Sequence, residues 1–336
     1  MNILYIIGNG FDIAQGCDTS YAAFYDYLKQ NHNDDPDIKE LLVHIESDQN
    51  KNWSDMERAL GEYTAEFEDE SKFRELYFKI KDALQVFLTE IDQSFVTIDA
   101  IRDKYHRDLV RPDTYLNKLE QQTFDNYFNS FHLEGKNLSI ATFNYTQILE
   151  KALGNIVEMK TLPTAHNVYR FNEYCKIHGS INDEMLMGVD SIEQVKNAKF
   201  RDNEDFTDYF VKPKENRELG ELVDDAMAKQ ISASNLIVTM GTSFGITDNT
   251  WWKRIGTELR NRTNLYVIIN AYDNSAESAR RALLPGIKRK KKYDFLKQCG
   301  IKENEYELFR NRVFVSLNEG FLQPKLYAGK DERVGR

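Results

Sequence analysis

Short runs of apolar residues recur along the chain, and most of them are unbroken rather than alternating with polar residues. Unbroken runs of this length are typical of strands buried on both faces, as in a parallel sheet. Segments with a helical spacing of apolar residues separate several runs, which predicts helices that cross over between parallel strands. We therefore predict an α/β fold with helices on both faces of the sheet. The expected strands are residues 3–7, 138–143, 174–178, 185–189, 236–240, 265–269 and 313–317.

Two segments between these runs have a different pattern. Residues 21–135 carry apolar side chains at helical spacing with little Gly or Pro between them, so we predict a helical insertion after the first strand. We expect it to roof the cleft of an α/β domain built from residues 1–20 and 136–336. Residues 191–225 are charged and have few apolar anchors, and we expect either a mobile flap or a loop that orders when a ligand binds.

Composition narrows the class of protein. The 336 residues carry a net charge of −10, which makes nucleic acid an unlikely partner because phosphate neutralisation needs an excess of Lys and Arg. The basic run KRKKK at residues 288–292, next to Pro285 and Gly286, is interpreted as a solvated loop. Three scattered cysteines without a C-x-x-C indicate neither a zinc site nor disulfides, and no metal is expected.

The distribution of apolar residues also predicts where in the cell the protein is located. No apolar stretch approaches the twenty or so residues that a membrane span requires. The first apolar run is short and has no basic residues before it, unlike a signal peptide. A soluble, cytoplasmic protein without a membrane partner is therefore expected.

The first expected strand runs into the turn Gly8-Asn9-Gly10. The dinucleotide fingerprint G-x-G-x-x-G would need a third glycine where the chain has Ile13, and the next glycine is Gly16. Gly8 and Gly10 still allow a close backbone approach, and free N–H groups in such a turn can bind a pyrophosphate. A strand-to-helix corner that requires positive φ explains the same residues, so both interpretations stay open.

A second polar turn, Asn144-Tyr145-Thr146, follows the expected strand 138–143. In open α/β sheets, ligands bind at the carboxyl ends of the strands. The amide of Asn144 offers both a donor and an acceptor, which suits a ribose hydroxyl or a water. The alternative is that one of these residues only caps the next helix, and this alternative is stronger for Thr146 than for Asn144.

His178 and Gly179 stand at the end of another expected strand. A histidine at such a position, with a glycine beside it to leave room, is a candidate general base because imidazole titrates near neutral pH. A lone histidine is more often structural or on the surface. The position of His178 at a strand end favours the functional interpretation.

Two further motifs carry polar groups. Gly241, Thr242 and Ser243 follow the expected strand 236–240, and their hydroxyls can bond to a ribose or a phosphate. Asp248, a few residues later, is more simply an N-cap for the next helix. In "NWSDMERAL", Ser54 and Glu57 fit a capping box, which is a sufficient structural explanation for both. We expect the adjacent Trp53 either to pack on the start of this helix as a hydrophobic staple or to line the ligand pocket.

In their order along the chain, these motifs resemble the AbiH family of bacterial abortive-infection proteins. The family pattern includes an opening I-I-G-N-G-F-D-x-x-x-G-x-x-T-S-Y, a W-x-D-x-E helix, an F-N-Y-T strand end, an H-G-S and a G-x-S-x-G-x-x-D. The resemblance spans nearly the whole chain, and the ordered combination is specific. The matching residues are 6–21, Trp53, Asp55, Glu57, 143–146, 178–180 and 241–248.

The AbiH family is in turn remotely similar to the sirtuin-type NAD-binding fold, which implies a Rossmann-like sheet. Gly8 and Gly16 keep the interval between the sirtuin glycines, and residues 143–146 are similar to the sirtuin Q-N-I-D. The chain departs from the sirtuin pattern at Thr146, which replaces an aspartate, and at Asp12, which replaces a serine. The four zinc cysteines of sirtuins are also absent, so NAD cleavage with water as acceptor is favoured over deacetylation.

The resemblance thus implies an antiphage effector that cleaves the N-glycosidic bond of NAD, its substrate, and releases nicotinamide. Asn144 would position the ribose or a water, and His178 would be the catalytic base. Asp12 would cap its helix or stabilise the developing cation. Such an activity must be silent in healthy cells, which implies a phage-derived trigger or assembly into a homo-oligomer. The residues expected to contact the nucleotide are Gly8, Asn9, Gly10, Phe11, Asp12, Thr19, Tyr145, Gly241, Thr242, Ser243 and Asp248.

Two other classes of function stay open at this point. The first is a nucleotide-binding sensor or interaction module without enzymatic activity, since fold does not fix function and the sirtuin aspartate is missing. The second is an effector that acts on nucleic acid through residues 288–292. The acidic net charge and the lack of metal-ligand clusters in the sequence weigh against this second class.

Overall fold

A computed structural model describes residues 1–47, 56–131, 135–154, 161–163 and 168–324. Within these residues a sheet of seven strands forms the centre of the molecule, in the order β3-β4-β2-β1-β5-β6-β7. Six strands are parallel and β3 joins the edge in the antiparallel direction. The strands are β1 (Asn2–Ile7), β2 (Lys136–Thr142), β3 (Thr161–Pro163), β4 (Val168–Lys176), β5 (Leu236–Met240), β6 (Tyr266–Ala271) and β7 (Val313–Leu317).

The order of the parallel strands confirms the predicted α/β class and is that of a Rossmann-like sheet. Counted along the chain, the parallel strands lie in the order 3-2-1-4-5-6, the usual arrangement of that fold. The direction of winding reverses between β1 and β5. Ile7, the last residue of β1, pairs with Thr142 on one side and with Met240 on the other, so the three neighbouring strands end level with one another.

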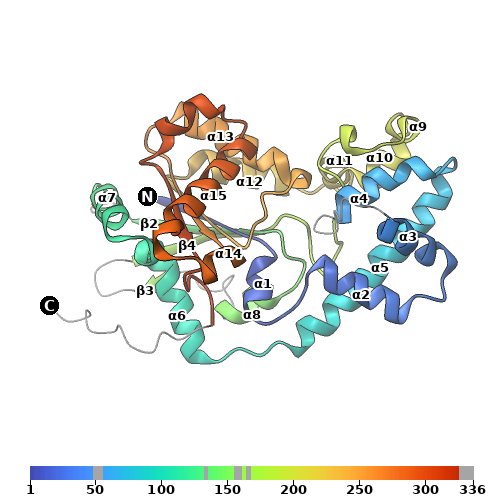
Figure 1. Cartoon of the computed structure of the whole chain (residues 1–336), viewed down its shortest axis with the longest axis horizontal. Helices are drawn as coiled ribbons and strands as arrows, with labels where there is room; N and C mark the ends of the chain where they lie inside the picture. Colours follow the sequence, from blue (N-terminus) through green and yellow to red (C-terminus); the bar gives the residue numbers. More distant parts are fainter. Residues whose placement is uncertain (48–55, 132–134, 155–160, 164–167, 325–336) are drawn as a thin grey trace.

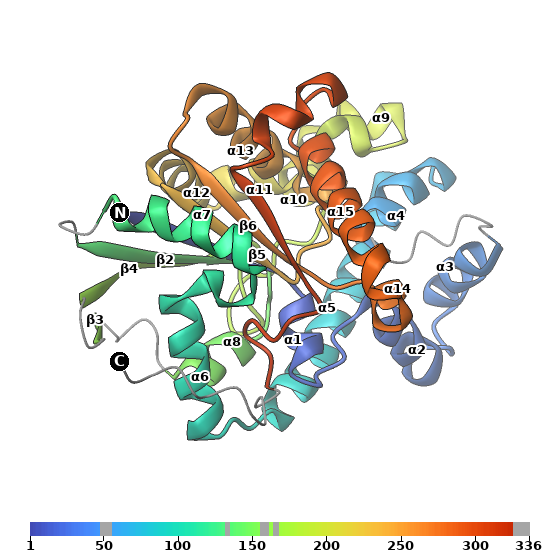
Figure 2. The ribbon, with the colours of Figure 1, turned by 60° about the vertical axis from the view of Figure 1, so that its left-hand side comes forward.

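Helices cover both faces of this sheet, as Figure 2 shows. One face packs into an apolar core that includes Phe11, Tyr105, Phe124 and Ile148, from α1 (Gly10–Ala14), α6 (Asp99–Val110), α7 (Lys118–Asn129) and α8 (Ile148–Leu153). The opposite face packs against α12 (Val223–Ala233), α13 (Asn249–Asn261) and α15 (Leu284–Gln298) through a second core. β1, β5 and β7 are buried on both faces along almost their whole length, which explains their unbroken apolar runs, whereas β4 carries exposed residues.

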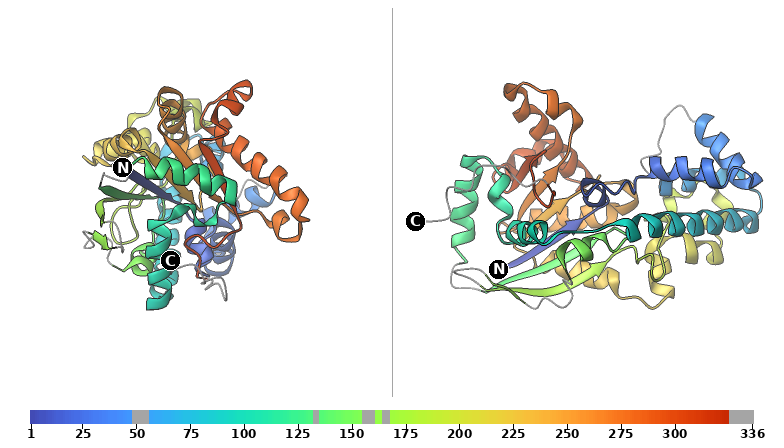
Figure 3. Two further views of the ribbon diagram at one scale, coloured as in Figure 1. Left: turned by 90° about the vertical axis from the view of Figure 1, so that its left-hand side faces the viewer. Right: turned by 90° about the horizontal axis from the view of Figure 1, so that it is seen from below.

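A helical lobe extends from one end of the sheet, as Figures 1 and 3 show. It has its own apolar core, with Phe24 and Phe73 at its centre. Residues 191–225 also contribute to this core, since Phe206 and Phe210 are fully buried in it. These phenylalanines anchor the segment, and its mobility stays a prediction. The lobe consists of α2 (Tyr21–Asn31), α3 (Pro36–Ser47), α4 (Met56–Tyr63), α5 (Glu70–Ser94), α9 (Ala198–Arg201), α10 (Glu204–Phe210) and α11 (Lys212–Glu218).

Shorter elements complete the chain. The remaining α-helix is α14 (Asn274–Ser278), and the described residues also form short 3-10 helices. None of the described helices combines the length and the apolar character that crossing a membrane would require. The 3-10 helices are η2 (Thr64–Glu66), η3 (Pro112–Tyr115), η4 (Ile192–Gln194), η5 (Ile246–Asp248), η6 (Arg281–Leu283) and η7 (Glu303–Phe309).

Two local predictions are wrong. Residues 185–189 form no strand but only isolated bridges at Met185 and Val189, and the side chains of Met185, Met187 and Val189 pack into the core of the helical lobe. Short apolar runs do not distinguish a strand from other buried backbone. The basic run 288–292 lies within α15 rather than in a loop, because Pro285 stands in the first turn of that helix, where a missing N–H has no cost.

Candidate active site

Four polar turns meet at the carboxyl edge of the sheet. They follow β1, β2, β4 and β5 and contain Gly8, Asn144, His178 and Gly241 respectively. The parallel register places these strand ends side by side, and a sheet of this order binds ligands at the same edge. The fold therefore brings the predicted motifs together, although their side chains form two separate clusters.

The opening glycine turn is a tight backbone corner. The N–H of Gly8 donates to the carbonyl of Met240, and the N–H of Gly10 donates to the carbonyl of Gly241, each at 2.9 Å. Phe11 N–H donates back to the carbonyl of Gly8 at 2.9 Å. A Cβ added to Gly10 would lie 2.6 Å from the Cα of Gly241, so the glycines permit two strand ends to touch. These N–H groups are already bonded, and binding of a diphosphate here stays a prediction.

The other predicted contacts around this corner have structural partners. Asn9 and Thr19 bind each other, with the Thr19 hydroxyl donating to Asn9 Oδ1 and Asn9 Nδ2 donating to the Thr19 carbonyl at 3.0 Å. The ring of Phe11 is buried in the core. Thr242 packs its methyl group towards Gly8, while Ser243 is exposed beside it. Of the hydroxyl residues in this group, Ser243 is exposed, Thr242 is half-buried and Thr19 is buried.

Asp12 is the centre of the first polar cluster. Its side chain is 1% exposed and accepts hydrogen bonds from Asn144 Nδ2 at 2.7 Å and from Thr146 Oγ1 at 2.6 Å. Burial raises the pKa of Asp12 to about 7, and these two donors offset only part of that rise. The predicted cap at Thr146 is wrong, because its hydroxyl bonds to Asp12 and Gln147 is the N-cap of α8. Asn144 Oδ1 has no hydrogen-bond partner among the described residues.

His178 is the centre of the second cluster, whose hydrogen-bond partners differ from those of Asp12. Its ring lies beside Phe143 and Tyr145, at centroid distances of 5.1 and 6.0 Å. Its Nε2 lies 2.9 Å from Asp248 Oδ1 and 3.2 Å from Lys212 Nζ. Asp248 stands at the N-cap position of α13, as predicted, but its side chain makes no capping hydrogen bond and orients the imidazole instead.

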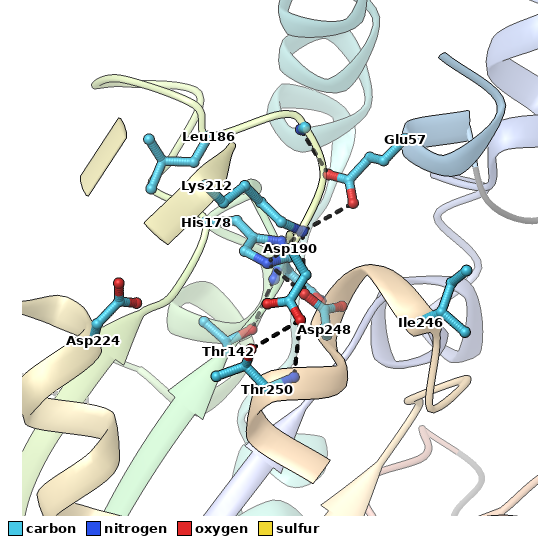
Figure 4. A network of polar contacts seen from close by, with 12 residues as sticks. Glu57, Thr142, His178, Leu186, Asp190, Lys212, Asp224, Ile246, Asp248 and Thr250 are labelled. Atoms are coloured by element: carbon cyan, nitrogen blue, oxygen red, sulfur yellow. Dashed lines mark hydrogen bonds and ion pairs between the residues drawn. The ribbon is translucent and has the colours of Figure 1, made fainter. Parts of the chain in front are cut away.

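A buried lysine joins this histidine to the helical lobe. Figure 4 shows Lys212 from α11 reaching Glu57 Oε2 at 2.9 Å and Asp248 Oδ1 at 3.1 Å. Burial alone would lower the pKa of Lys212, but the two carboxylates outweigh it and hold that pKa above its ordinary value. Burial alone would raise the pKa of Asp248, but Lys212 and His178 keep it below its usual range. Both groups are therefore charged at neutral pH.

Glu57 has a different role from the one its sequence suggested. Its proposed capping partner, Ser54, lies outside the described residues. The carboxylate of Glu57 is buried against Lys212 and accepts a hydrogen bond from the Tyr145 hydroxyl at 3.3 Å. The W-x-D-x-E motif was the signal in the sequence that pointed to this residue. Tyr145 also donates to the carbonyl of Leu186 at 2.9 Å, so its ring is fixed beside His178.

A hollow of about 140 Å³ opens beside His178 and Lys212. Four carboxylates line it, against the two permanent cations Lys212 and Arg254. Asp190 accepts from the backbone N–H and the hydroxyl of Thr250, both at 2.9 Å (Figure 4). Burial raises the pKa of Asp190 and has the same effect on Asp224, another of the lining residues. The hollow is thus acidic, and the glycine corner is not part of its lining. Its carboxylates belong to Asp190, Asp224, Asp225 and Asp248.

Most of the residues around this hollow were missed in the sequence. Lys212, Asn216 and Asp224 come from the charged segment 191–225, which the pattern marked only as a flap or a ligand-ordered loop, and Asp190 directly precedes it. The charge of this segment was visible in the sequence, but which side chains these residues contact depends on the tertiary fold.

The fold and the site define an α/β protein with a Rossmann-like parallel sheet and a buried polar site at its carboxyl edge. The chain belongs to the AbiH family: the sequence model described as bacteriophage abortive infection AbiH matches residues 4–269. This range includes both polar clusters and the hollow, and it assigns the protein a role in phage abortive infection. No curated protein matches the chain. The similarity to sirtuins stays a prediction.

Proposed function

We propose that this protein acts in abortive infection by cleaving the N-glycosidic bond of NAD and releasing nicotinamide. The observation that carries the proposal is the pair His178–Asp248, with a 2.9 Å contact, beside an acidic hollow at the carboxyl edge of the sheet. A histidine oriented by a carboxylate is a common arrangement for a general base. Depletion of NAD would stop phage replication by stopping the metabolism of the host cell.

The charge of the hollow suits the reacting end of NAD. The nicotinamide ring is positively charged before cleavage, and the transition state places positive charge on the ribose, as in glycoside hydrolysis. The lining carboxylates stabilise positive charge and disfavour phosphate. Pockets that hold a drug-sized ligand measure about 300–1,000 Å³. The hollow of about 140 Å³ therefore suits one ring, with the phosphates outside it.

The proposed step uses His178 as the base. A water oxygen forms a bond to ribose C1′ while the bond from C1′ to the ring nitrogen breaks, and its electron pair leaves with neutral nicotinamide. The proton of the water passes to Nδ1, because Nε2 already faces Asp248 and Lys212. The carboxylate of Asp248 favours the imidazole with its hydrogen on Nε2, which leaves a lone pair on Nδ1.

Asn144 has a separate place in this proposal. Its amide nitrogen bonds to Asp12 rather than to any group near His178. Its Oδ1 is buried without a partner in the described chain, and a buried acceptor of this kind is costly unless a donor reaches it. A ribose hydroxyl or a water is a suitable donor. Asn144 would then position the substrate or the nucleophile.

A second candidate function is a nucleotide-binding sensor without catalysis. The observation that favours it is the position of Lys212, whose ammonium lies 3.2 Å from the imidazole and within the same ion network. In this alternative the ion network holds a surface that binds NAD, and the bound NAD is not cleaved.

Nicotinamide release by the purified protein distinguishes the two functions. With NAD as substrate and an extract of phage-infected cells as the source of the trigger, the wild-type chain should release nicotinamide, and His178→Ala should reduce the rate about 10²-fold or more, the usual effect of losing a general base. The matched control is His106→Ala, since His106 bonds to the carbonyl of Leu153 at 2.9 Å and does not line the hollow. It should retain the wild-type rate. Binding of NAD without release of nicotinamide by the wild type would support the sensor instead.

A further inference from the structure

The first half of α15 and the turn before it form a strongly basic surface, residues 280–292. This segment carries seven Arg and Lys side chains and no Asp or Glu. Among the described residues, Lys291 is the one of these cations that forms an ion pair, with Asp273 at 3.1 Å. The basic surface therefore has positive charge that the described part of the molecule does not neutralise. Its exposed cations without an ion pair are Arg280, Arg281, Arg289 and Lys290.

This charge is unfavourable for the helix that carries it. Lys288 stands three and four residues before Lys291 and Lys292, so like charges are neighbours on the helix surface and repel each other. The first turn of α15 has no acidic residue, and its N-cap residue, Leu283, makes no capping hydrogen bond with its side chain. Cations near the start of a helix also oppose the helix dipole. A departure of this kind from the rules of local stability is expected where function requires it.

The outer face of α3 and the neighbouring η2, in the helical lobe, form an acidic surface. Glu40 and Glu66 are exposed there and have no ion pair among the described residues. Burial raises the pKa of Tyr63 to about 12, and nearby carboxylates add to this rise. They belong to Glu40, Glu66 and Asp37, which therefore lie around one ring. Figure 1 shows α15 beside the sheet and α3 at the far end of the lobe, so the two surfaces do not meet within one chain.

Exposed apolar side chains distinguish a protein partner from a polyanion. Leu283 is 60% exposed in the basic surface, and Val43 is 59% exposed on α3, three residues after Glu40. These two side chains can bury each other when the surfaces dock, whereas a phosphate backbone offers only polar contacts. A helix that lies in a membrane surface needs an apolar face, but the exposed positions of α15 after its first turn are polar. A second copy of this chain supplies both the carboxylates and the apolar contact.

We propose that the basic surface of one copy docks on the acidic surface of a second copy of this chain. The exposed cations of α15 face Glu40 and Glu66. Leu283 packs against Val43 beside them. Because the two surfaces differ and lie apart, the contact is head-to-tail and joins the copies into a ring or an open chain. This inference goes beyond the proposed function, since it concerns assembly and does not depend on cleavage of NAD.

Sedimentation velocity on the full-length protein tests this association. At about 50 mM NaCl the wild type should form species larger than a monomer as its concentration rises, and about 500 mM NaCl should dissociate them because salt screens exposed charges. The double variant Arg289→Glu with Lys290→Glu should weaken self-association about tenfold or more, since like charges would then meet. The matched control, Lys118→Glu with Lys229→Glu, has the same net charge but changes exposed lysines outside the basic surface, and it should associate as the wild type does.

An exchange of charges tests which surfaces pair. Glu40→Lys with Glu66→Lys should weaken self-association as much as the double variant of α15. An equal mixture of the two double variants should associate, because the reversed basic surface of one then faces the reversed acidic surface of the other. Association of the mixture also shows that both variants are folded.

Three results would overturn the proposal. They are a wild type that stays monomeric at about 50 mM NaCl, self-association that the double variant of α15 leaves unchanged, and a mixture of folded variants that does not associate. Fluorescence anisotropy with a short DNA duplex and flotation with phosphatidylglycerol vesicles test the other occupants. Binding of either probe by a monomeric wild type, lost in the double variant of α15, would assign the basic surface to nucleic acid or to a membrane instead.

Discussion

At the scale of single residues, the site depends on carboxylates that are buried for different reasons. Asp248 is held ionised by Lys212 and His178. Among the described residues no cation contacts Asp12 directly, and its side-chain partners are the neutral side chains of Asn144 and Thr146. Burial therefore dominates for Asp12 and raises its pKa to about 7. The two aspartates respond differently to pH.

Asp12 should make the protein less stable as the pH rises. Its folded-state pKa of about 7 lies above the ordinary value of 3.8, so between these values the folded state binds a proton that the unfolded state has lost. Its contribution to the free energy of unfolding is fully present below pH 3.8 and is lost as the pH rises through about 7. The slope is about 1.4 kcal/mol per pH unit in that window.

Asp12→Asn measures this effect, since the amide keeps the shape of the protonated carboxyl group. Urea unfolding at several pH values should show that wild-type stability falls relative to Asp12→Asn from about pH 4 to pH 7 and then stays level. A stability difference that is constant with pH, or that changes in favour of the wild type, would contradict the account of Asp12.

The sequence allowed the positions of the site residues to be predicted but not their partners. Asn144 and His178 were recognisable because each follows an apolar run, and the ends of parallel strands share an edge. That Asn144 faces Asp12 while His178 faces Asp248 follows from the direction of each side chain in a turn, which no spacing rule contains. Lys212 lies in a charged segment far from both in the sequence, so only the fold reveals its role.

At the scale of elements, the contact between the β1 and β5 turns determines how the strand ends meet. Gly241 has φ = 70°, and a Cβ there would lie 2.5 Å from the nitrogen of Phe11. Gly16 has a similar φ of 84°, but a Cβ there would meet nothing within 4 Å. A comparison of substitutions at Gly16 and Gly241 therefore separates the free-energy cost of the backbone conformation from that of the close approach.

Gly241→Ala should therefore be much more harmful than Gly16→Ala. A left-handed conformation alone costs an alanine about 1–2 kcal/mol, which is the loss expected for Gly16→Ala. Gly241→Ala adds an overlap with backbone that cannot move away, and its loss should exceed about 4 kcal/mol or prevent folding. Thermal unfolding of both variants checks this, and equal losses would show that the corner is not as tight as described.

Most of the sheet was predictable because a strand buried on both faces leaves an unbroken apolar run. The residues 185–189 gave the same signal for a different reason, since they are buried under the helical lobe without pairing as a strand. The prediction of a loop at 288–292 is wrong because Pro285, an ordinary turn signal, lies in the first turn of α15. Local signals of this kind acquire their meaning from tertiary contacts.

At the scale of the whole molecule, the buried ion network connects the helical lobe to the sheet. Glu57 belongs to α4 in the lobe, Lys212 to α11, and Asp248 to the turn before α13 (Figure 4). Both Lys212 and Glu57 are almost fully buried. Removing the cation would leave two carboxylates without compensation, which is more costly than losing an exposed ion pair.

Lys212→Met should destabilise the protein by about 3–5 kcal/mol, the range for breaking a buried ion pair. Lys214 is a matched control two residues away, since its ion pair with Asp208 is partly exposed and Lys214→Met should cost about 1 kcal/mol or less. Adding Glu57→Gln to Lys212→Met should restore part of the loss. Urea denaturation measures all three variants, and similar losses for the two lysines would contradict the importance of the network.

The proposed role of this AbiH protein in abortive infection is the cleavage of NAD, with His178 as the general base. The most direct measurement is the NAD and nicotinamide content of cells that express the chain, infected with a phage whose plaque formation the wild-type chain reduces. In cells that express the wild-type chain, we expect NAD to fall and nicotinamide to rise after infection. Cells that express His178→Ala should keep the NAD content of uninfected cells and lose protection. Protection by the wild type with an unchanged NAD content would contradict the claim.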